Sequence, residues 1–168
     1  MSARNALFAE AARLIAAADG LLVAAGAGMG VDSGLPDFRG NAGFWRAYPA
    51  LADARIAFEE IACPDAFRRT PALAWGFYGH RLNLYRHTRP HAGFAMLRAI
   101  AARLSRGGFV FTSNVDGQFQ RAGFAEAEVC EVHGSIHHLQ CMAGCDGAIV
   151  PADDSIPDVN AAACLLRS

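Results

Sequence analysis

A glycine-rich segment directly after a short apolar run constrains the fold of this 168-residue chain more than any other feature. Residues 21–25 read LLVAA, and residues 26–30 read GAGMG. A buried strand that runs into glycines is typical of α/β proteins, because a glycine turn lets backbone N–H groups approach a phosphate closely. Taken alone, the pattern fits a plain glycine-rich turn between packed elements equally well.

Regular segments surround this feature. Residues 5–18 place apolar side chains three to four positions apart, which predicts a helix that packs by one face. A helical period over 91–104 precedes a second buried-strand pattern at 109–112. Residues 41–92 indicate helices in pieces, bounded by prolines and rich in core-type aromatic residues. The order strand, helical crossover, strand predicts an α/β fold, a Rossmann-like parallel sheet flanked by helices.

Composition narrows the class of protein. The formal net charge of −1 gives no electrostatic attraction for nucleic acid or an anionic membrane. No apolar stretch approaches the roughly 20 residues of a membrane span, so we expect no membrane partner and a cytoplasmic location. All 15 basic residues are arginines, which excludes a Schiff-base lysine and a lysine-bearing phosphate loop. Five dispersed cysteines argue against a disulfide framework.

The glycine segment continues into a Pro-Asp-Phe-Arg run at residues 36–39. Arg39 can form bidentate bonds to a diphosphate, and Phe38 can cover a ribose. The whole run, GAGMGVDSGLPDFRG, resembles the first signature of the sirtuin family of NAD-dependent protein deacylases, although Gly30 stands where serine is common. The resemblance implies that NAD is the cofactor and that the residues contacting it here are Gly26, Ala27, Gly28, Pro36, Asp37, Phe38 and Arg39.

A second motif, Thr-Ser-Asn-Val-Asp at residues 112–116, follows the second predicted strand. It resembles a sirtuin motif in which glutamine replaces Ser113. The resemblance implies that Ser113, Asn114 and Asp116 bind the cofactor, with Asn114 ordering the nicotinamide ribose and its water as part of catalysis. A carboxylate such as Asp116 can also orient a carboxamide leaving group on chemical grounds. Without the first motif, an Asn or Asp cap at a strand-to-helix turn explains the residues equally well.

The third motif is Glu-Val-His-Gly-Ser at residues 131–135. It resembles the catalytic element of sirtuins, which makes His133 the general base that takes a proton from the ribose, a role suited to an imidazole. The resemblance implies NAD-dependent deacylation of lysine, with transfer of the acyl group to ADP-ribose and release of nicotinamide. Because the chain contains no lysine, the acylated substrate must be another protein molecule.

Cys141 and Cys145 lie just after the third motif, where sirtuins carry the first cysteine pair of a structural zinc site. Two thiolates are half of the ligand set of a closed tetrahedral site, so zinc is expected here only with an incomplete ligand set. Cys164, or His137 and His138, could supply further ligands, although exposed histidines are the simpler interpretation.

The resemblance covers nearly the whole chain but only about two-thirds of a typical sirtuin core. We therefore expect a C-terminally truncated sirtuin with two parts: the N-terminal part of an NAD-binding domain over 1–135, with its helical insertion around 41–92, and a partial zinc-module segment over 136–168. Two alternatives to deacylation stay open. The chain could be a catalytically impaired NAD-binding remnant, or an NAD hydrolase or ADP-ribosyltransferase.

Overall fold

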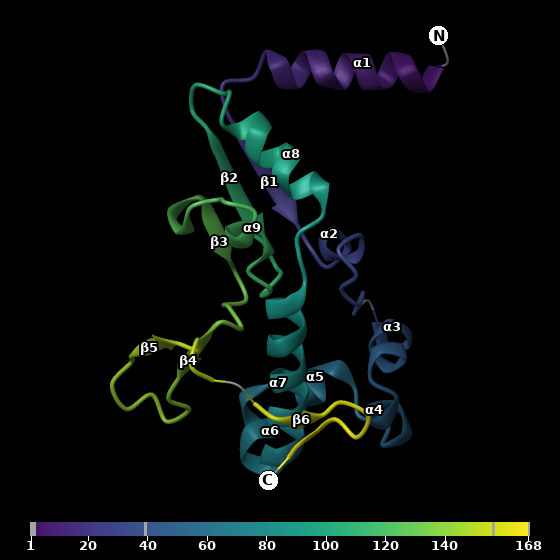
Figure 1. Cartoon of the computed structure of the whole chain (residues 1–168), viewed down its shortest axis with the longest axis vertical. Coiled ribbons are helices and arrows are strands. Elements are labelled where there is room, and N and C mark those ends of the chain that lie inside the picture. The colour runs from purple at the N-terminus through teal and green to yellow at the C-terminus, as the bar shows by residue number, and fades with distance from the viewer. Residues whose placement is uncertain (1–2, 39, 156, 168) are drawn as a thin grey trace.

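The computed structural model describes residues 3–38, 40–155 and 157–167. Its centre is a parallel sheet of three strands in the order β1-β2-β3 (Figure 1). These strands are β1 (Leu21–Ala25), β2 (Gly108–Thr112) and β3 (Val129–Glu131). Val110 pairs with Val23 on one side and with Val129 on the other. The predicted parallel sheet is confirmed, and both predicted strands lie where the apolar runs placed them.

Two helices cover one face of this sheet, namely α8 (Ala92–Ala101) and α9 (Gln118–Arg121). Side chains alternate between the two faces of a strand, so Val23, Ala25 and Val110 point toward the helices. There they meet an aromatic group in which Phe119 packs edge-on against Phe94, with ring centroids 4.8 Å apart. A short 3-10 turn, η1 (Glu126–Glu128), leads into β3.

The opposite face of the sheet is open within the described part of the chain. Leu22, Phe109 and Phe111 point to that side with exposed fractions of 70%, 43% and 50%. The prediction of flanking helices is therefore confirmed for one face of the sheet.

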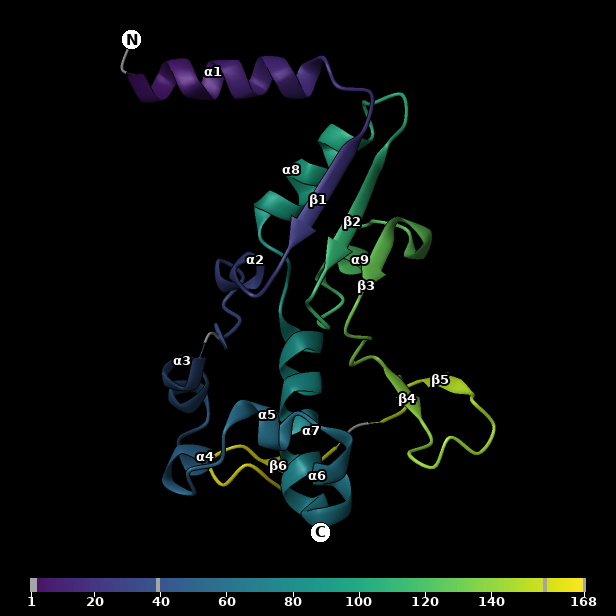
Figure 2. The same ribbon diagram turned by 180° about the vertical axis from the view of Figure 1, so that it is seen from behind.

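The first helix, α1 (Ala3–Ala16), extends away from the sheet in both views (Figures 1 and 2). The prediction of a helix is confirmed, but the prediction that it packs by one face is wrong, because none of its residues is buried. Its apolar side chains Leu7 and Phe8 are 72% and 67% exposed, since no described element lies against them closely enough to bury them. Among the described residues, no helix has both the length and the hydrophobicity needed to cross a membrane.

Short helices form a second body below the sheet in Figure 1, and the prediction of helices in pieces is confirmed. Proline occupies the first position of three of them, where its missing N–H costs nothing. Their aromatic core includes Phe44 and Phe77, both fully buried. The helices of this body are α3 (Gly40–Ala47), α4 (Pro49–Asp53), α5 (Phe58–Ile61), α6 (Pro64–Arg69) and α7 (Pro71–His87), whereas α2 (Gly28–Val31) follows β1 and packs against the core of the sheet.

Two small antiparallel pairs complete the described chain. The first is the hairpin of β4 (His138–Gln140) and β5 (Ile149–Pro151), and the second consists of β6 (Val159–Asn160) and β7 (Leu165–Leu166). The β6–β7 pair packs across α7, so the last part of the chain rests on the helical body.

Candidate active site

A cavity of about 1080 Å³ opens at the carboxyl ends of the three strands. This is the edge at which open α/β sheets bind ligands, because the connecting loops and helix ends diverge there. Segments that follow β1, β2 and β3 line one side of the cavity, while helices α5 to α7 and the β4–β5 hairpin line the other. Residues from all three sequence motifs therefore meet in one space.

The segment after β1, residues 26–35, is called the glycine loop below. It turns tightly, since the Met29 backbone N–H donates to the Gly26 carbonyl at 2.9 Å and α2 begins at Gly28. Ala27 lines the cavity, and Gly26 and Gly28 form the turn beside it. A Cβ added at Gly30 would lie 3.0 Å from the Leu35 side chain. The absence of a serine at position 30 thus matches the close packing of Leu35.

The Pro-Asp-Phe part of the first motif borders the same cavity. Pro36 and Phe38 line it, and Asp37 between them is half-buried. The Phe38 ring stacks on Phe58 at a centroid distance of 6.0 Å, so an aromatic surface lines the cavity. Arg39, the predicted diphosphate ligand, lies outside the described residues.

Asn114 links the loops that follow β1 and β2. Its Nδ2 donates to the Gly26 carbonyl at 3.0 Å, and its backbone N–H donates to Thr112 Oγ1 at 3.0 Å. The side chain lines the cavity together with Ser113, whose backbone N–H donates to the Ala25 carbonyl at 3.2 Å. Asn114 is thus held rigidly against the glycine loop, a positioning function that the sequence motif did not reveal.

Asp116 is a buried carboxylate on the wall of the cavity, with an exposed fraction of 7%. Its Oδ1 accepts the backbone N–H of Gln118 at 3.0 Å, and Nε2 of His137 lies 3.0 Å from its backbone carbonyl. Burial raises the pKa of Asp116, and the bond from Gln118 and the nearby Arg81 cation partly oppose that rise. The carboxylate is fixed in place and poorly hydrated, so it can accept a hydrogen bond from a ligand strongly.

His133 reaches the same cavity from the segment after β3. Gly134 directly after it has a φ of +79°, a left-handed conformation that glycine adopts at little cost, and its N–H donates to the Glu131 carbonyl at 3.0 Å. This turn leaves the His133 side chain exposed at the cavity. An exposed imidazole in the same cavity as a buried carboxylate and an ordered amide is suited to proton transfer.

Arg81 is a cavity residue that the sequence analysis missed. It lies on α7 with an exposed fraction of only 6%, and its Nε and Nη2 donate to the Tyr85 hydroxyl at 3.0 and 2.9 Å. Its guanidinium lies over the rings of Phe38 and Phe77, 5.0 and 5.1 Å from their centroids. Within the described residues it forms no ion pair. The sequence does hold a signal for this residue. Arg81 lies four positions from both Phe77 and Tyr85, a spacing that places the three side chains on one face of a helix.

Cys141 and Cys145 do not line this cavity, and both lie in the exposed turn between β4 and β5. The sulfur atoms of Cys141 and Cys145 are 2.8 Å apart, and the hydrogen bond from Cys145 lowers the pKa of Cys141 to about 7. Over residues 3–38, 40–155 and 157–167, no group of three or more His, Cys, Asp or Glu side chains could hold a metal. Cys164 forms no such group with the pair and is buried in the core around α7. His137 and His138 form none with it either: His138 is exposed, as expected, whereas His137 is half-buried with Nε2 3.0 Å from the Asp116 carbonyl.

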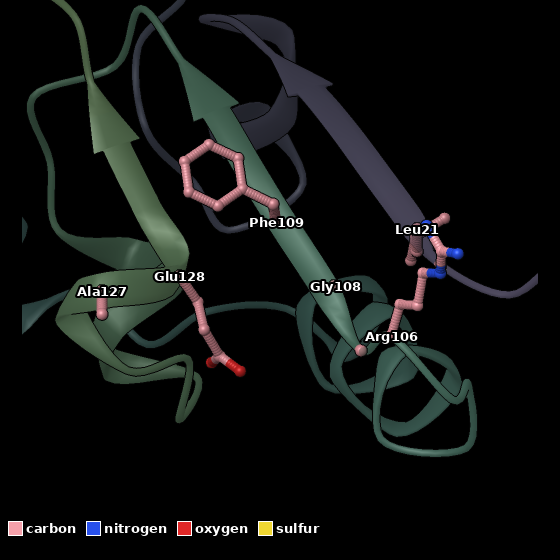
Figure 3. Close-up of a pocket in the computed structure, with 8 residues that line it drawn as sticks. Leu21, Arg106, Gly108, Phe109, Ala127 and Glu128 are labelled. Carbon is pink, nitrogen blue, oxygen red and sulfur yellow. The ribbon is translucent and has the colours of Figure 1, made fainter.

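A second, smaller cavity of about 350 Å³ lies at the opposite end of the sheet (Figure 3). Leu21, Arg106, Phe109 and Glu128 surround it, at the amino ends of the strands. None of the predicted site residues lines it. We therefore place the candidate active site in the larger cavity.

Comparison with known proteins agrees with this geometry. The family model for the Sir2 family matches residues 26–164, from the start of the glycine loop to Cys164. The chain belongs to the Sir2 family. Its Rossmann-like parallel sheet is therefore the Sir2 fold, and the motifs after β1, β2 and β3 are Sir2 motifs.

Curated Sir2 relatives share about a third or more of the matched residues. The chain is 40% identical over 132 residues to NAD-dependent protein deacylase 2 of Pyrobaculum aerophilum, covering 78% of this chain and 48% of that protein. It is 35% identical over 125 residues to the mitochondrial NAD-dependent protein deacylase sirtuin-5 of Danio rerio, covering 73% and 38%. The chain thus spans about half, or less, of the length of these relatives.

Solved Sir2 structures superpose on most of the chain. A Sir2 homologue variant in complex with ADP-ribose matches with a TM-score of 0.68 and 28% identity, covering 94% of this chain and 60% of that one. A Sir2 homologue in complex with NAD matches with a TM-score of 0.67 and 28% identity, covering 91% and 57%. The likeness extends over nearly all of the chain, although each of those chains is considerably longer.

Proposed function

We propose that this chain carries the catalytic part of an NAD-dependent protein lysine deacylase, which transfers the acyl group of another protein's lysine to ADP-ribose and releases nicotinamide. The observation that supports this most is the single cavity lined by Asn114, Asp116 and His133. Asn114 and Asp116 follow β2 and His133 follows β3, and a purely structural function would not require them to share one space. Membership of the Sir2 family supports the same reaction.

The residues of the cavity fit NAD. The glycine loop offers backbone N–H groups in a tight turn in which Gly26 and Gly28 carry no side chain, which suits a diphosphate held close to the backbone. Phe38 offers an aromatic face, and Asp116 offers a desolvated acceptor for a carboxamide. Bound NAD would supply the ADP-ribosyl group that accepts the acyl group.

Different residues of the chain would then orient the cofactor, accept a proton and exclude water. Asp116 orients the carboxamide by accepting its N–H, while Asn114, held by Gly26, orders the adjacent ribose region. His133 takes a proton from a ribose hydroxyl as general base. The apolar wall of Phe58, Phe67 and other helical residues excludes water from the acyl group.

The test is nicotinamide release from NAD, measured with and without an acyl-lysine peptide. Release that depends on the peptide supports deacylation. Release without the peptide would favour NAD hydrolysis or ADP-ribosyl transfer, and no release with normal folding would favour an NAD-binding remnant.

Arg81 points to the class of acyl group within this proposal. No carboxylate among the described residues forms an ion pair with this guanidinium, which is 6% exposed and lies on the wall of the cavity beside Tyr78. Its Nε and Nη2 bond to Tyr85, and none of the hydrogen bonds between described residues uses Nη1. A carboxylate on the acyl chain would supply both the charge and the acceptor. We therefore propose acyl groups that end in a carboxylate.

The experiment compares two peptides with the wild-type chain and with Arg81→Met, which keeps an unbranched apolar side chain and removes the charged guanidinium. We expect the wild type to prefer a succinyl-lysine peptide over an acetyl-lysine peptide, and Arg81→Met to lose about tenfold or more of that preference. An unchanged ratio of kcat/KM values would contradict the proposal.

For zinc, Cys141 and Cys145 supply half of a four-ligand site, and the described residues do not provide the rest. We assign zinc no part in the reaction. The division into an NAD-binding part over 1–135 and a second segment over 136–168, and the cytoplasmic location, stay predictions from the sequence.

A further inference from the structure

The turn between β4 and β5 brings two thiols together on the surface of the protein (Figure 2). The chain bends back at Gly144, whose φ is +64° and whose backbone N–H donates to the Cys141 carbonyl at 3.0 Å. Glycine adopts this left-handed conformation at little cost. Cys145 then lies beside Cys141, and its Sγ donates to the Cys141 Sγ at 2.8 Å. Both residues are free thiols, and both are exposed.

The pair lacks the partners that a closed zinc site needs. Such a site takes four ligands, and within residues 3–38, 40–155 and 157–167 no third His, Cys, Asp or Glu side chain joins the two sulfurs. Cys164 is buried in the core around α7, and Cys63 donates to the Glu60 carbonyl. The two thiols of the turn are therefore free to react with each other.

We propose that Cys141 and Cys145 form a reversible disulfide, with a low-molecular-weight disulfide as the oxidant. The sulfurs of a disulfide lie about 2.05 Å apart, so these two must approach by less than about 1 Å. Rotation of the two exposed side chains supplies that movement, because neither is packed in a core. The ring would enclose Met142, which lines the larger cavity. The inference does not depend on the proposed deacylation.

The reaction consists of two thiol–disulfide exchanges. First, Cys141 Sγ, which accepts the hydrogen bond from Cys145, attacks one sulfur of the small disulfide. The S–S bond of the oxidant breaks, and one small thiol leaves with the Cys141 proton. Cys145 Sγ then attacks Cys141 Sγ in the mixed disulfide, and the second small thiol leaves with the Cys145 proton. The protein loses two electrons and two protons, and the oxidant is reduced to two thiols.

The charges around the turn favour an anionic oxidant. Nη2 of Arg68, on α6, donates to the Met142 carbonyl at 3.4 Å, which brings a guanidinium to the turn. Arg68 forms no ion pair within the described part of the chain. Asp146 follows the pair directly, but its Oδ1 accepts the backbone N–H of Ala148. Oxidised glutathione, which carries several carboxylates, is thus a suitable probe.

The experiment equilibrates the purified chain with oxidised and reduced glutathione at about 1 mM, below the effective concentration of a thiol held this close. Remaining thiols are alkylated before digestion with a protease that cleaves after Glu and Asp. Cleavage after Glu131 and Asp146 yields a peptide, 132–146, that contains Cys141 and Cys145 and no other cysteine. A disulfide leaves this peptide unalkylated and lighter by two hydrogen atoms. The variants are Cys145→Ser, which removes one thiol of the pair, and Cys63→Ser, a control that keeps both.

In the wild type and in Cys63→Ser, we expect the bridged peptide to exceed the glutathione adduct at least about tenfold, because the second thiol is already in place. In Cys145→Ser, the adduct on Cys141 should be the main product. Dithiothreitol should return both forms to free thiols. Wild-type peptide with two adducts, with two alkylated thiols, or bonded to a second chain would overturn the proposal. Equimolar zinc in the purified protein that keeps both thiols from reacting would overturn it as well.

Discussion

At the scale of single residues, burial changes the ordinary behaviour of charged side chains around the cavity. Asp116 is nearly inaccessible, and removal from water raises its pKa. Arg81 has aromatic rings around it where water would otherwise solvate it. Neither arrangement is favourable for folding by itself, because desolvation of a charge costs free energy unless a partner compensates. Such arrangements are typical of ligand sites, where the ligand becomes the partner.

His133→Ala should lower acyl-peptide-dependent nicotinamide release by about a hundredfold or more, because the general base is removed. The thermal unfolding curve should stay the same, since His133 is exposed and its loss opens no cavity. His87→Ala, another exposed histidine, serves as the control and should keep full turnover. Normal deacylation by His133→Ala would refute the assignment of the base.

Asp116→Asn should impair nicotinamide exchange and, at neutral pH, stabilise the fold. The pKa of Asp116 is raised in the folded state, so the folded protein binds a proton more readily than the unfolded chain. Wild-type stability therefore falls as pH rises from the unfolded pKa through the raised folded pKa, and the ionised carboxylate is a cost at pH 7. Asparagine avoids that cost and can still accept the Gln118 N–H.

Thermal unfolding of both proteins between about pH 4 and pH 7 checks the sign of this effect. The advantage of the Asn variant should shrink toward acidic pH, where Asp116 is protonated. An advantage that grows on acidification would show that desolvation does not dominate at this site.

At the scale of elements, the sequence predicted regular structure better than it predicted packing. The apolar runs at 21–25 and 109–112 coincide with β1 and β2, because buried strands in a parallel sheet need continuous apolar side chains. The apolar side chains spaced three to four positions apart in α1 predicted the helix correctly and its burial wrongly. Such a period shows that a helix has an apolar face, but it does not show whether another element packs against that face. The β6–β7 pair was not predicted, because strands of two residues leave no periodic signal.

Two glycines on α7 allow that pair to lie across the helix. A Cβ at Gly76 would collide with the backbone of Cys164, and a Cβ at Gly79 would lie 2.8 Å from the Pro157 ring. Gly76→Ala should therefore destabilise the protein by about 1–3 kcal/mol in urea unfolding, although alanine normally favours a helix. Ala72→Ser, at an exposed position of the same helix, should stay within about 0.5 kcal/mol of wild type. A Gly76→Ala protein as stable as wild type would show that β6–β7 does not hold this position in solution.

At the scale of the whole molecule, the described chain has a closed helical body and a sheet with one open face. The open face carries Leu22, Phe109 and Phe111, and exposed apolar groups of this kind promote association. The Sir2 relatives are about twice as long as the part matched here or longer. We expect this open face to govern self-association in solution, whereas the candidate site lies at the carboxyl edge of the sheet.

Replacing both Phe109 and Phe111 by threonine should reduce self-association measured by light scattering at rising concentration. Threonine keeps strand propensity while removing apolar surface. The control, Phe124→Thr on the buried side, should instead destabilise the fold by about 3 kcal/mol or more, because it opens a cavity in the core. Unchanged scattering by the double variant would show that the open face does not drive association.

The sequence by itself determined the backbone of the site. Local chemistry fixes that part, because glycines permit the turn after β1, an apolar run makes the strand, and a polar run at the strand end reaches the ligand edge. Tertiary structure alone decided which side chains share the cavity and in what state. Arg81 enters it because α7 packs against Phe38, Asn114 binds Gly26 because β1 and β2 are neighbours, and His91 holds the glycine loop because α8 begins beside α2. Such contacts join residues tens of positions apart, so their strength depends on burial and geometry, which no local pattern of residues encodes.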